Sequence, residues 1–221
     1  TKSPIRLFAD DCILYRYIQS EQDTVTLQAD LDQLAHWERL WQMDFNPTKC
    51  CVMQVSRAKR CRIPFPEYSL RGHVLDRVDS ASYLGVCLTS DLNWKDHISK
   101  ITKKTNRTLG FVKRNVRTGS KLSKERAYQA LVRPCLEYCS TVWDPHQKGL
   151  TQRVEMVQRR AARYVSNRHH NTSSVTEMLG QLGWETLQER RARARLCMVY
   201  KVVTNLVAIP APIYFTPSNS R

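Results

Sequence analysis

The chain has 221 residues, of which 42% are hydrophobic, so it can bury a core and is not disordered by composition. Lysine and arginine number 35 against 20 aspartate and glutamate residues, and the net charge of +15 indicates a polyanionic partner. No uncharged apolar run reaches the length of about 18 residues that a membrane span needs. The chain opens with Thr1 and without a signal-peptide pattern, so we expect a fragment or an excised region.

The N-terminal residues predict a β-hairpin. Residues 5–9 alternate between two sets of side chains, as a strand does, and residues 12–17 are again rich in β-forming types. Asp10 and Asp11 lie between these two runs. We therefore expect a tight hairpin with an acidic tip.

A helix and several short strands are expected next. From Asp23 the apolar period becomes helical, and Asn46-Pro47 ends the pattern. One face of this helix carries Leu27, Leu31, Leu34 and Trp41. Short strands are then expected over residues 51–55, 73–78 and 83–88, and a basic loop is expected over residues 57–62.

After Trp94 the pattern is helical almost to the end. The first helix is expected over residues 98–116, and Gly119-Ser120 breaks it. Ser123 is expected to cap the second helix, whose apolar stripe runs to Cys139, and Pro134 predicts a kink inside it. Further helices are expected near residues 150–164, 174–179 and 185–203, followed by a loose proline-containing tail from residue 210.

These elements predict an α+β half followed by an all-helical half, with the junction near residues 89–95. Residues 1–94 carry 11 basic and 12 acidic residues, whereas residues 95–221 carry 24 basic and 8 acidic ones. Solubility alone is one explanation of a basic surface. Its confinement to one half of the chain favours a nucleic-acid footprint.

The eight cysteines do not form a metal-binding or disulfide pattern. No Cys-x-x-Cys pair occurs, and no cysteine is spaced from a histidine as in a zinc finger. Without a secretory signal, we expect all eight to be reduced and intracellular.

The neighbouring carboxylates of Asp10 and Asp11 are a candidate metal site. Mg²⁺ prefers oxygen ligands and is usually held by one or two carboxylates together with substrate phosphates. Two such ions about 4 Å apart activate a hydroxyl nucleophile and stabilise the leaving group in phosphoryl transfer. Aspartate is also a common turn residue, and the pair alone does not separate the two explanations.

Four motifs in order resemble a polymerase family. Residues 5–15, IRLFADDCILY, resemble the reverse-transcriptase box that carries an aromatic-Ala-Asp-Asp tetrad at a hairpin tip. Residues 44–50, DFNPTKC, resemble the next family motif, and residues 82–98, SYLGVCLTSDLNWKDHI, resemble the strand pair called the primer grip. Two later segments, LVRPCLEYCSTVWDP and LGQLGWETLQERR, are similar to the thumb and post-thumb region of non-LTR (LINE) retrotransposon polymerases of the jockey type.

The resemblance implies a fold and a set of site residues. It implies a partial reverse-transcriptase palm over residues 1–92 and a basic helical thumb and post-thumb region over residues 93–221. Asp10 and Asp11 match the metal-ligand positions, and Lys49 matches the proposed general acid for pyrophosphate release. The primer-grip match is Tyr83, Leu84 and Gly85, which would hold the primer 3′ hydroxyl in line.

Two parts of the family's catalytic site are missing from this sequence. The third carboxylate and the nucleotide-binding fingers precede the tetrad in the family, and only nine residues precede Asp10 here. The resemblance implies RNA-directed DNA synthesis with Mg²⁺, deoxynucleoside triphosphates, an RNA template and a DNA primer. We expect weak or absent Mg²⁺ binding and no polymerisation by this chain alone. Nuclear and cytoplasmic localisation is expected by analogy with the family, without a membrane association.

Basic residues off the apolar helix faces are candidates for contact with a primer–template duplex. They are Lys103, Lys104, Lys113, Arg114, Arg153 and Arg160. Phosphate contacts of this kind give affinity with little sequence specificity. Two other functions stay open: a non-catalytic nucleic-acid-binding module, and a helical interaction protein whose charge serves solubility.

Overall fold

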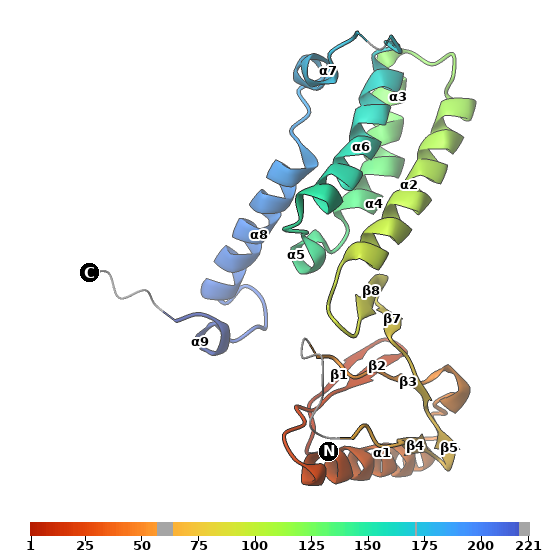
Figure 1. Cartoon of the computed structure of the whole chain (residues 1–221), viewed down its shortest axis with the longest axis vertical. Helices are drawn as coiled ribbons and strands as arrows, with labels where there is room; N and C mark the ends of the chain where they lie inside the picture. The colour runs from red at the N-terminus through yellow and green to blue at the C-terminus, as the bar shows by residue number, and fades with distance from the viewer. Residues whose placement is uncertain (57–63, 171, 217–221) are drawn as a thin grey trace. The chain divides into compact units, whose positions relative to one another are not determined.

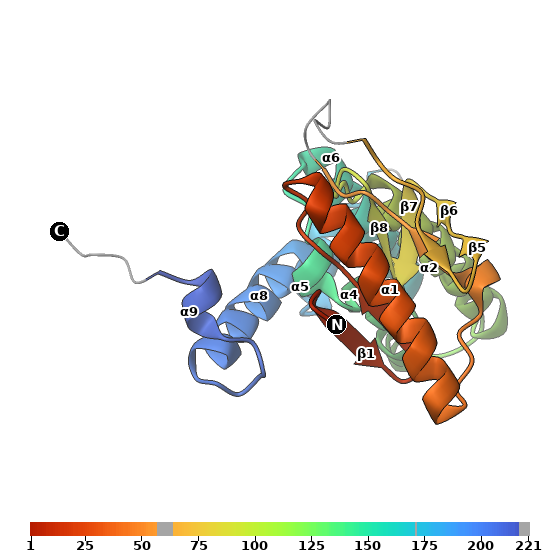
Figure 2. The same cartoon turned by 90° about the horizontal axis from the view of Figure 1, so that it is seen from below.

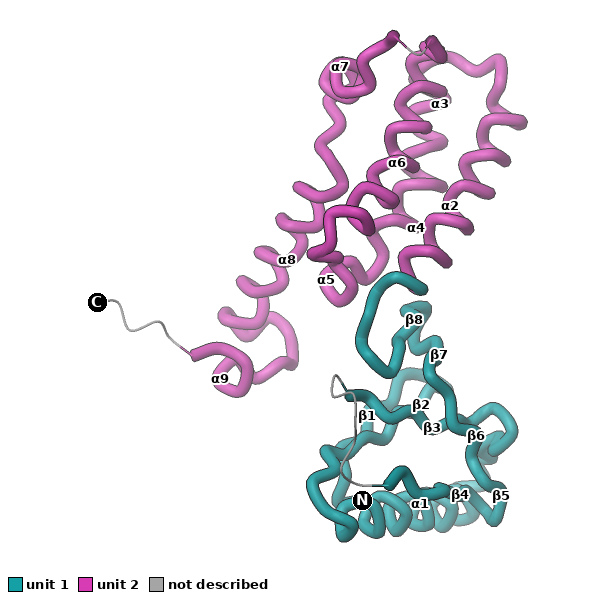
Figure 3. Tube along the Cα trace, in the orientation of Figure 1, with its two compact units in different colours: residues 1–96 teal, residues 97–221 magenta. Residues whose placement is uncertain are grey.

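The structure is a computed structural model that describes residues 1–56, 64–170 and 172–216. The basic loop expected at residues 57–62 therefore lies outside the described residues. The chain divides into two units, residues 1–96 and residues 97–221, which are coloured separately in Figure 3. The first unit mixes strands with one long helix, and the second is helical, so the α+β character expected from the sequence is observed.

Pairs of short strands make up the sheets of the first unit. β1 (Ile5–Phe8) pairs antiparallel with β2 (Asp11–Leu14), and β7 (Ser80–Tyr83) pairs antiparallel with β8 (Val86–Thr89). β4 (Ser69–Leu70) and β5 (His73–Val74) form a smaller antiparallel pair. β3 (Cys51–Val52) and β6 (Asp76–Arg77) pair in parallel.

Two of the strands predicted from periodicity are interrupted. The strand expected over residues 73–78 is split into β5 and β6 at Leu75, whose side chain is buried and whose N–H donates to the carbonyl of Tyr68 at 2.8 Å. The strand expected over residues 83–88 turns back at residues 84–85. At Leu75 the chain changes its pairing partner from β4 to β3, and at residues 84–85 it reverses direction. Periodicity concealed both, because it reports burial and not hydrogen-bond partners.

The long helix α1 (Glu21–Trp41) supplies the apolar face of the first unit. Leu27 and Leu31 pack against the buried cluster of Tyr68, Leu70 and Leu75, as the sequence pattern predicts. The sequence pattern also puts Trp41 on this apolar face, and that prediction is wrong, because the Trp41 side chain is 67% exposed. Trp41 is the last residue of the helix and Gln42 turns left-handed with φ 54°, so the stripe ends before Trp41 reaches the core.

Two aspartates of α1 hold both ends of the first hairpin. Asp30 is buried, and its carboxylate accepts hydrogen bonds from the backbone N–H groups of Lys2 and Ser3, each at 2.7 Å. Asp23 pairs with Arg16, just after the hairpin, at 3.0 Å. Hydrogen bonds from Gln19, Ser20 and Arg16 lower the pKa of Asp23 to about 2. The chain therefore enters and leaves the hairpin at anchored points.

The second unit is a helical bundle whose elements can be followed in Figures 1 and 2. Its helices are α2 (Lys95–Asn115, which begins at the end of the first unit), α3 (Lys121–Ala127), α4 (Arg133–Glu137), α5 (Ser140–Trp143), α6 (Lys148–Val165), α7 (Val175–Gln181), α8 (Leu187–Val203) and α9 (Ala211–Tyr214). α9 lies in the segment expected to be a loose tail. No helix among the described residues is long and apolar enough to span a membrane.

A π-helical turn, η2 (Tyr128–Val132), joins α3 to α4 beside the predicted kink. Pro134 lies in the first turn of α4, where its missing N–H costs least. Only part of the predicted apolar stripe is buried across this turn. Leu136 is fully buried, whereas Leu131, which belongs to the same predicted stripe, is 49% exposed. The predicted cap is also displaced, because Ser120 rather than Ser123 accepts the capping hydrogen bond.

Truncation of these two leucines tests the inward face. Leu136→Ala is expected to lower the free energy of unfolding by about 2–5 kcal/mol, because it leaves a cavity in a closed core. Leu131→Ala is expected to change it by no more than about 0.5 kcal/mol. Equilibrium urea unfolding measures both. Equal losses would contradict the difference in burial between the two side chains.

Candidate active-site hairpin and nucleic-acid interface

The first hairpin presents two carboxylates at its tip. The tight hairpin is as predicted, but its two-residue loop is Ala9-Asp10 and not Asp10-Asp11, because Phe8 pairs with Asp11, the first residue of β2. Ala9 has φ 50°, a left-handed conformation that costs a residue with a Cβ about 1–2 kcal/mol. Asp10 and Asp11 are both exposed, and neither carboxylate forms a hydrogen bond or ion pair with a described residue. Both carboxylates are therefore available to a ligand from solution.

Their chemistry fits a hard divalent cation only in part. Two adjacent carboxylates match the usual protein share of a Mg²⁺ site, in which substrate phosphates and water complete the coordination. Within residues 1–56, 64–170 and 172–216, no group of three or more histidine, cysteine, aspartate or glutamate side chains is placed to hold a metal ion. The hairpin thus supplies two oxygen ligands and not a closed protein cage.

Lys49 ends the single turn η1 (Pro47–Lys49), directly before β3. The Asn46 side chain accepts a hydrogen bond from the Thr48 N–H at 3.1 Å and so caps this turn. Lys49 is exposed, and it makes no hydrogen bond or ion pair to Asp10 or Asp11 within the described part of the chain. The local turn before a strand is as predicted, but the described contacts do not join Lys49 to the carboxylates.

The segment that carries Asp11 nevertheless runs near the segment that carries Lys49. Burial and the neighbouring Cys50 raise the pKa of the Cys12 thiol. Cys12 follows Asp11 in β2, and Cys50 follows Lys49. The loop before η1 is held by Glu38 of α1, which is buried and accepts a hydrogen bond from the Phe45 N–H at 2.6 Å. α1 therefore positions both the hairpin and the Lys49 turn.

Tyr83, Leu84 and Gly85 occupy the turn between β7 and β8. Tyr83 ends β7 and pairs with Val86. Leu84 has φ 46° and Gly85 has φ 77°, and positive φ at both loop positions matches the twist of a two-residue hairpin. Gly85 meets this requirement without strain, whereas Leu84 does so at a cost. The three residues are thus the tip of a second tight hairpin in the same unit.

The six basic candidates lie on two helices of the second unit and have no acidic partner among the described residues. Lys103, Lys104, Lys113 and Arg114 belong to α2, and Arg153 and Arg160 belong to α6. Lys103 and Arg114 are eleven residues apart and share one face of α2. Burial, together with the neighbouring Arg160, lowers the pKa of Lys113, so the structure brings these two cations close together.

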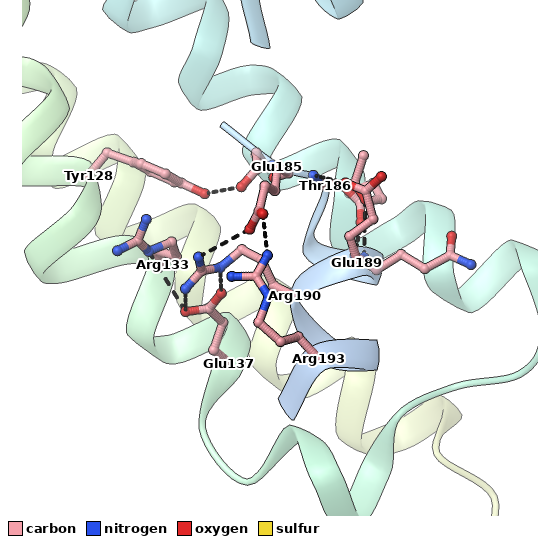
Figure 4. A network of polar contacts seen from close by, with 11 residues as sticks. Tyr128, Arg133, Glu137, Glu185, Thr186, Glu189, Arg190 and Arg193 are labelled. Atoms are coloured by element: carbon pink, nitrogen blue, oxygen red, sulfur yellow. Dashed lines mark hydrogen bonds and ion pairs between the residues drawn. The ribbon is translucent and has the colours of Figure 1, made fainter. Parts of the chain in front are cut away.

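The arginines of α8 behave differently, because acidic side chains neutralise them. Figure 4 shows Arg190 bound to Glu137 and Glu185, and Arg193 bound to Glu185. Asp144 accepts a hydrogen bond from the buried Arg191 at 2.8 Å and pairs with Arg195 at 3.1 Å. The basic charge of α8 therefore serves the bundle, whereas that of α2 and α6 has no acid to neutralise it within the described part of the chain.

Lys124 and Tyr164 lie outside the set of basic residues predicted from the sequence. Lys124 of α3 lies over the ring of Tyr164, with its Nζ 5.3 Å from the ring centroid. Lys113 approaches the same ring at 5.9 Å. Lys124 and Tyr164 are forty residues apart on different helices, so no local pattern in the sequence associates them.

Comparison with known proteins finds relatives in one class. The chain is 26% identical over 167 residues to the "RNA-directed DNA polymerase from mobile element jockey" of Drosophila melanogaster. It is 24% identical over 196 residues to the "Probable RNA-directed DNA polymerase from transposon BS" of the same organism. It is 26% identical over 187 residues to the "Retrovirus-related Pol polyprotein from type-1 retrotransposable element R1" of Nasonia vitripennis.

These alignments cover most of this chain but a small part of two relatives. They span 73%, 87% and 80% of the chain, and 18%, 21% and 55% of the respective relatives. No family model and no solved structure matches the chain. The resemblance predicted from the motifs is confirmed at the level of sequence, and the roles of the site residues stay predictions.

Substitution of Ala9 tests the geometry of the acidic tip. Ala9→Gly is expected to raise the free energy of unfolding by about 0.5–1 kcal/mol, because glycine adopts positive φ without a Cβ clash. Ala29→Gly, at an exposed position of α1, is the control and is expected to lower it by about 1 kcal/mol. Urea unfolding distinguishes them, and an equal loss in both variants would contradict the left-handed turn.

Proposed function

Because this chain is similar in sequence to the RNA-directed DNA polymerases of non-LTR retrotransposons, we propose that it is a part of such a polymerase. In this proposal residues 1–92 are a partial palm, and residues 93–221 are a thumb and post-thumb region that binds the primer–template duplex. One observation carries the proposal. The Phe8-Ala9-Asp10-Asp11 tetrad lies at the tip of a tight hairpin, where its two carboxylates have no partner among the described residues.

The proposed role of Asp10 and Asp11 is to bind the catalytic divalent ion. Mg²⁺ held there would supply the charge that brings the primer 3′ hydroxyl and the triphosphate together. The anchored hairpin suits this role, because Asp30 and Asp23 fix the two chain ends that lead to it.

Lys49 is proposed to act on the leaving pyrophosphate, and the second hairpin, β7–β8, is proposed to act on the primer terminus. Lys49 would donate a proton to the leaving pyrophosphate from a turn that the Asn46 side chain caps. Tyr83, Leu84 and Gly85 would hold the primer terminus, and a rigid two-residue turn restricts the displacement that makes misalignment costly.

The second unit is proposed to bind the phosphate backbone of the duplex. The candidates on α2 and α6 lack acidic neighbours among the described residues, so phosphates are the groups best able to neutralise them. Exposed helical cations reach phosphates of any sequence. The proposed partners are therefore an RNA template paired with a DNA primer, and deoxynucleoside triphosphates in the longer polymerase.

A non-catalytic nucleic-acid-binding module is the second candidate function. It is favoured by the two-carboxylate hairpin, since two divalent ions held by two carboxylates leave positive charge under-compensated. The two functions differ in the chemistry that this length of chain performs, and they share duplex binding. Primer extension and duplex binding therefore test separate parts of the proposal.

Primer extension tests the catalytic part. The purified chain, given Mg²⁺, a primed RNA template and deoxynucleoside triphosphates, is expected to extend the primer no more than a variant carrying both Asp10→Asn and Asp11→Asn. The physical reason is that no third carboxylate is grouped with Asp10 and Asp11 among the described residues, and two carboxylates alone do not fix the positions of the ions. Clear incorporation above the double variant would overturn this expectation and assign polymerase activity to these 221 residues.

Salt dependence tests duplex binding. If about five phosphates are neutralised, the plot of log affinity against log salt is expected to have a slope of roughly −4 to −5. Lys103→Gln together with Arg114→Gln is expected to reduce the magnitude of the slope by about 2. Arg193→Gln together with Arg195→Gln removes the same charge from ion-paired positions and is expected to change the slope little. A flat salt response of the wild-type chain would contradict duplex binding.

A further inference from the structure

The exposed face of α2 carries a row of cations. Successive residues of an α-helix are turned by about 100°, so residues spaced by whole turns lie along one face. Thr105, Leu109 and Val112 are buried on the opposite face, where α2 packs into the bundle. The exposed residues of the row, which we call the α2 stripe, are Lys100, Lys103, Lys104, Arg107, Phe111 and Arg114.

Little acidic charge opposes the α2 stripe. Asp96, at its start, is the one acidic residue in the sequence of α2. The cations of the stripe that follow Lys100 form no ion pair with a described residue, whereas the arginines of α8 do. From Lys100 to Arg114 the stripe rises about 21 Å, which is the axial length of about six nucleotides of one strand. It is therefore long enough to contact several consecutive phosphates.

Phe111 places an exposed aromatic ring within this row of cations. Its side chain is 54% exposed, and no ring or cation from the described part of the chain stacks on it. Arg107 precedes it by about one turn, and Arg114 follows it by about one turn. The Arg114 guanidinium lies back along the helix, with Nη1 3.5 Å from the point that a Cβ on Gly110 would occupy. The ring is thus open to a ligand and is flanked by positive charge.

This combination is typical of a surface that binds a single strand. One exposed apolar side chain is ordinary by itself and needs no function. Proteins that bind single-stranded nucleic acid, however, combine a positively charged track with aromatic side chains on which bases stack. A base inside a duplex is not accessible to such a ring, because it is stacked and paired within the helix. An aromatic ring within the α2 stripe therefore favours a strand that has an unpaired base.

We propose that Phe111 stacks on an unpaired base of a nucleic-acid strand whose phosphates bind the cations of the α2 stripe. The second unit then prefers a primer–template that has an unpaired template overhang to a blunt duplex. This inference rests on the proposed nucleic-acid binding by the second unit. It adds Phe111 and Arg107 to the interface, and it gives Phe111 a contact that depends on the state of the base and not on charge.

An anionic membrane is the other polyanion that a basic helix can bind. A helix that lies on a membrane inserts an apolar face between the lipid headgroups. The apolar face of α2 is buried in the bundle, and Phe111 is the one large apolar side chain of the stripe. A single ring offers little area for insertion, whereas it is sufficient to stack on one base. The α2 stripe therefore fits a nucleic-acid strand better than it fits a membrane.

The test compares the affinity of the chain for three RNA–DNA primer–templates. One is blunt, one has a short template overhang, and one has an abasic overhang with the same number of phosphates. The wild-type chain is expected to bind the normal overhang about 5- to 150-fold more tightly than the abasic one, which is the usual contribution of one stacked base. Phe111→Ala is expected to abolish this difference and to bind the blunt duplex as the wild-type chain does.

Matched variants separate stacking from charge and from apolar contact. Phe111→Trp keeps an aromatic face and is expected to retain the preference, whereas Phe111→Leu keeps only the apolar contact and is expected to lose it. Arg107→Gln is expected to reduce the magnitude of the salt slope by about 0.7–0.9 and to leave the preference unchanged. Tyr200→Ala removes an exposed aromatic side chain from α8 and is expected to change neither quantity.

The outcomes distinguish this inference from the proposed function. Equal affinity of the wild-type chain for the normal and abasic overhangs would overturn the stacking role of Phe111, and blunt-duplex binding would stand without it. Retention of the preference by Phe111→Ala or Phe111→Leu would overturn it as well, as would tighter binding to phosphatidylserine vesicles than to the overhang. Failure to bind the blunt duplex, with the preference for the normal overhang intact, would remove the proposed duplex binding and support the single-strand contact.

Discussion

Two carboxylates of α1 hold the structure of the acidic hairpin in place. An isolated two-stranded hairpin is at best marginally stable in water, and β1–β2 has only four paired positions. Asp30 binds the backbone before β1, and Asp23 binds Arg16 after β2, so both ends of the hairpin are attached to a helix of 21 residues. The left-handed strain at Ala9 persists because these anchors over-determine the turn. The tip can then keep two adjacent charges without a partner of its own.

Helix α1 also positions other segments of the first unit. Leu27 and Leu31 bury the apolar cluster of Tyr68, Leu70 and Leu75, and Glu38 holds the loop that leads to Lys49. The acidic hairpin and the Lys49 turn are both short. Their positions depend on buried carboxylates of α1 that accept backbone hydrogen bonds beside them.

In the second unit, the distribution of acids decides which cations are structural. Glu137, Asp144 and Glu185 neutralise the arginines of α8, and these pairs stabilise the contact of α8 with the bundle. The described acids leave α2 and α6 with uncompensated charge, and the ring of Tyr164 brings Lys113 and Lys124 together there. Net charge alone does not separate structural cations from unpaired ones, because an ion-paired arginine and an unpaired lysine each contribute +1 to it. The partition depends on which side chains face each other across the bundle.

Local pattern was enough to identify the α+β and helical halves, the hairpin with Asp10 and Asp11 at its tip, most helices, and the similarity to retrotransposon polymerases. These features depend on residues within one or two turns of each other, where steric preference and apolar period act directly. The tertiary structure decided the split at Leu75, the exposure of Leu131 and Trp41, the ion pairs of the α8 arginines, and the approach of Lys113 and Lys124 to the Tyr164 ring. Those outcomes join residues distant in the chain, and hydrogen-bond partners, π-turn geometry and charge pairing exist only when the elements pack together.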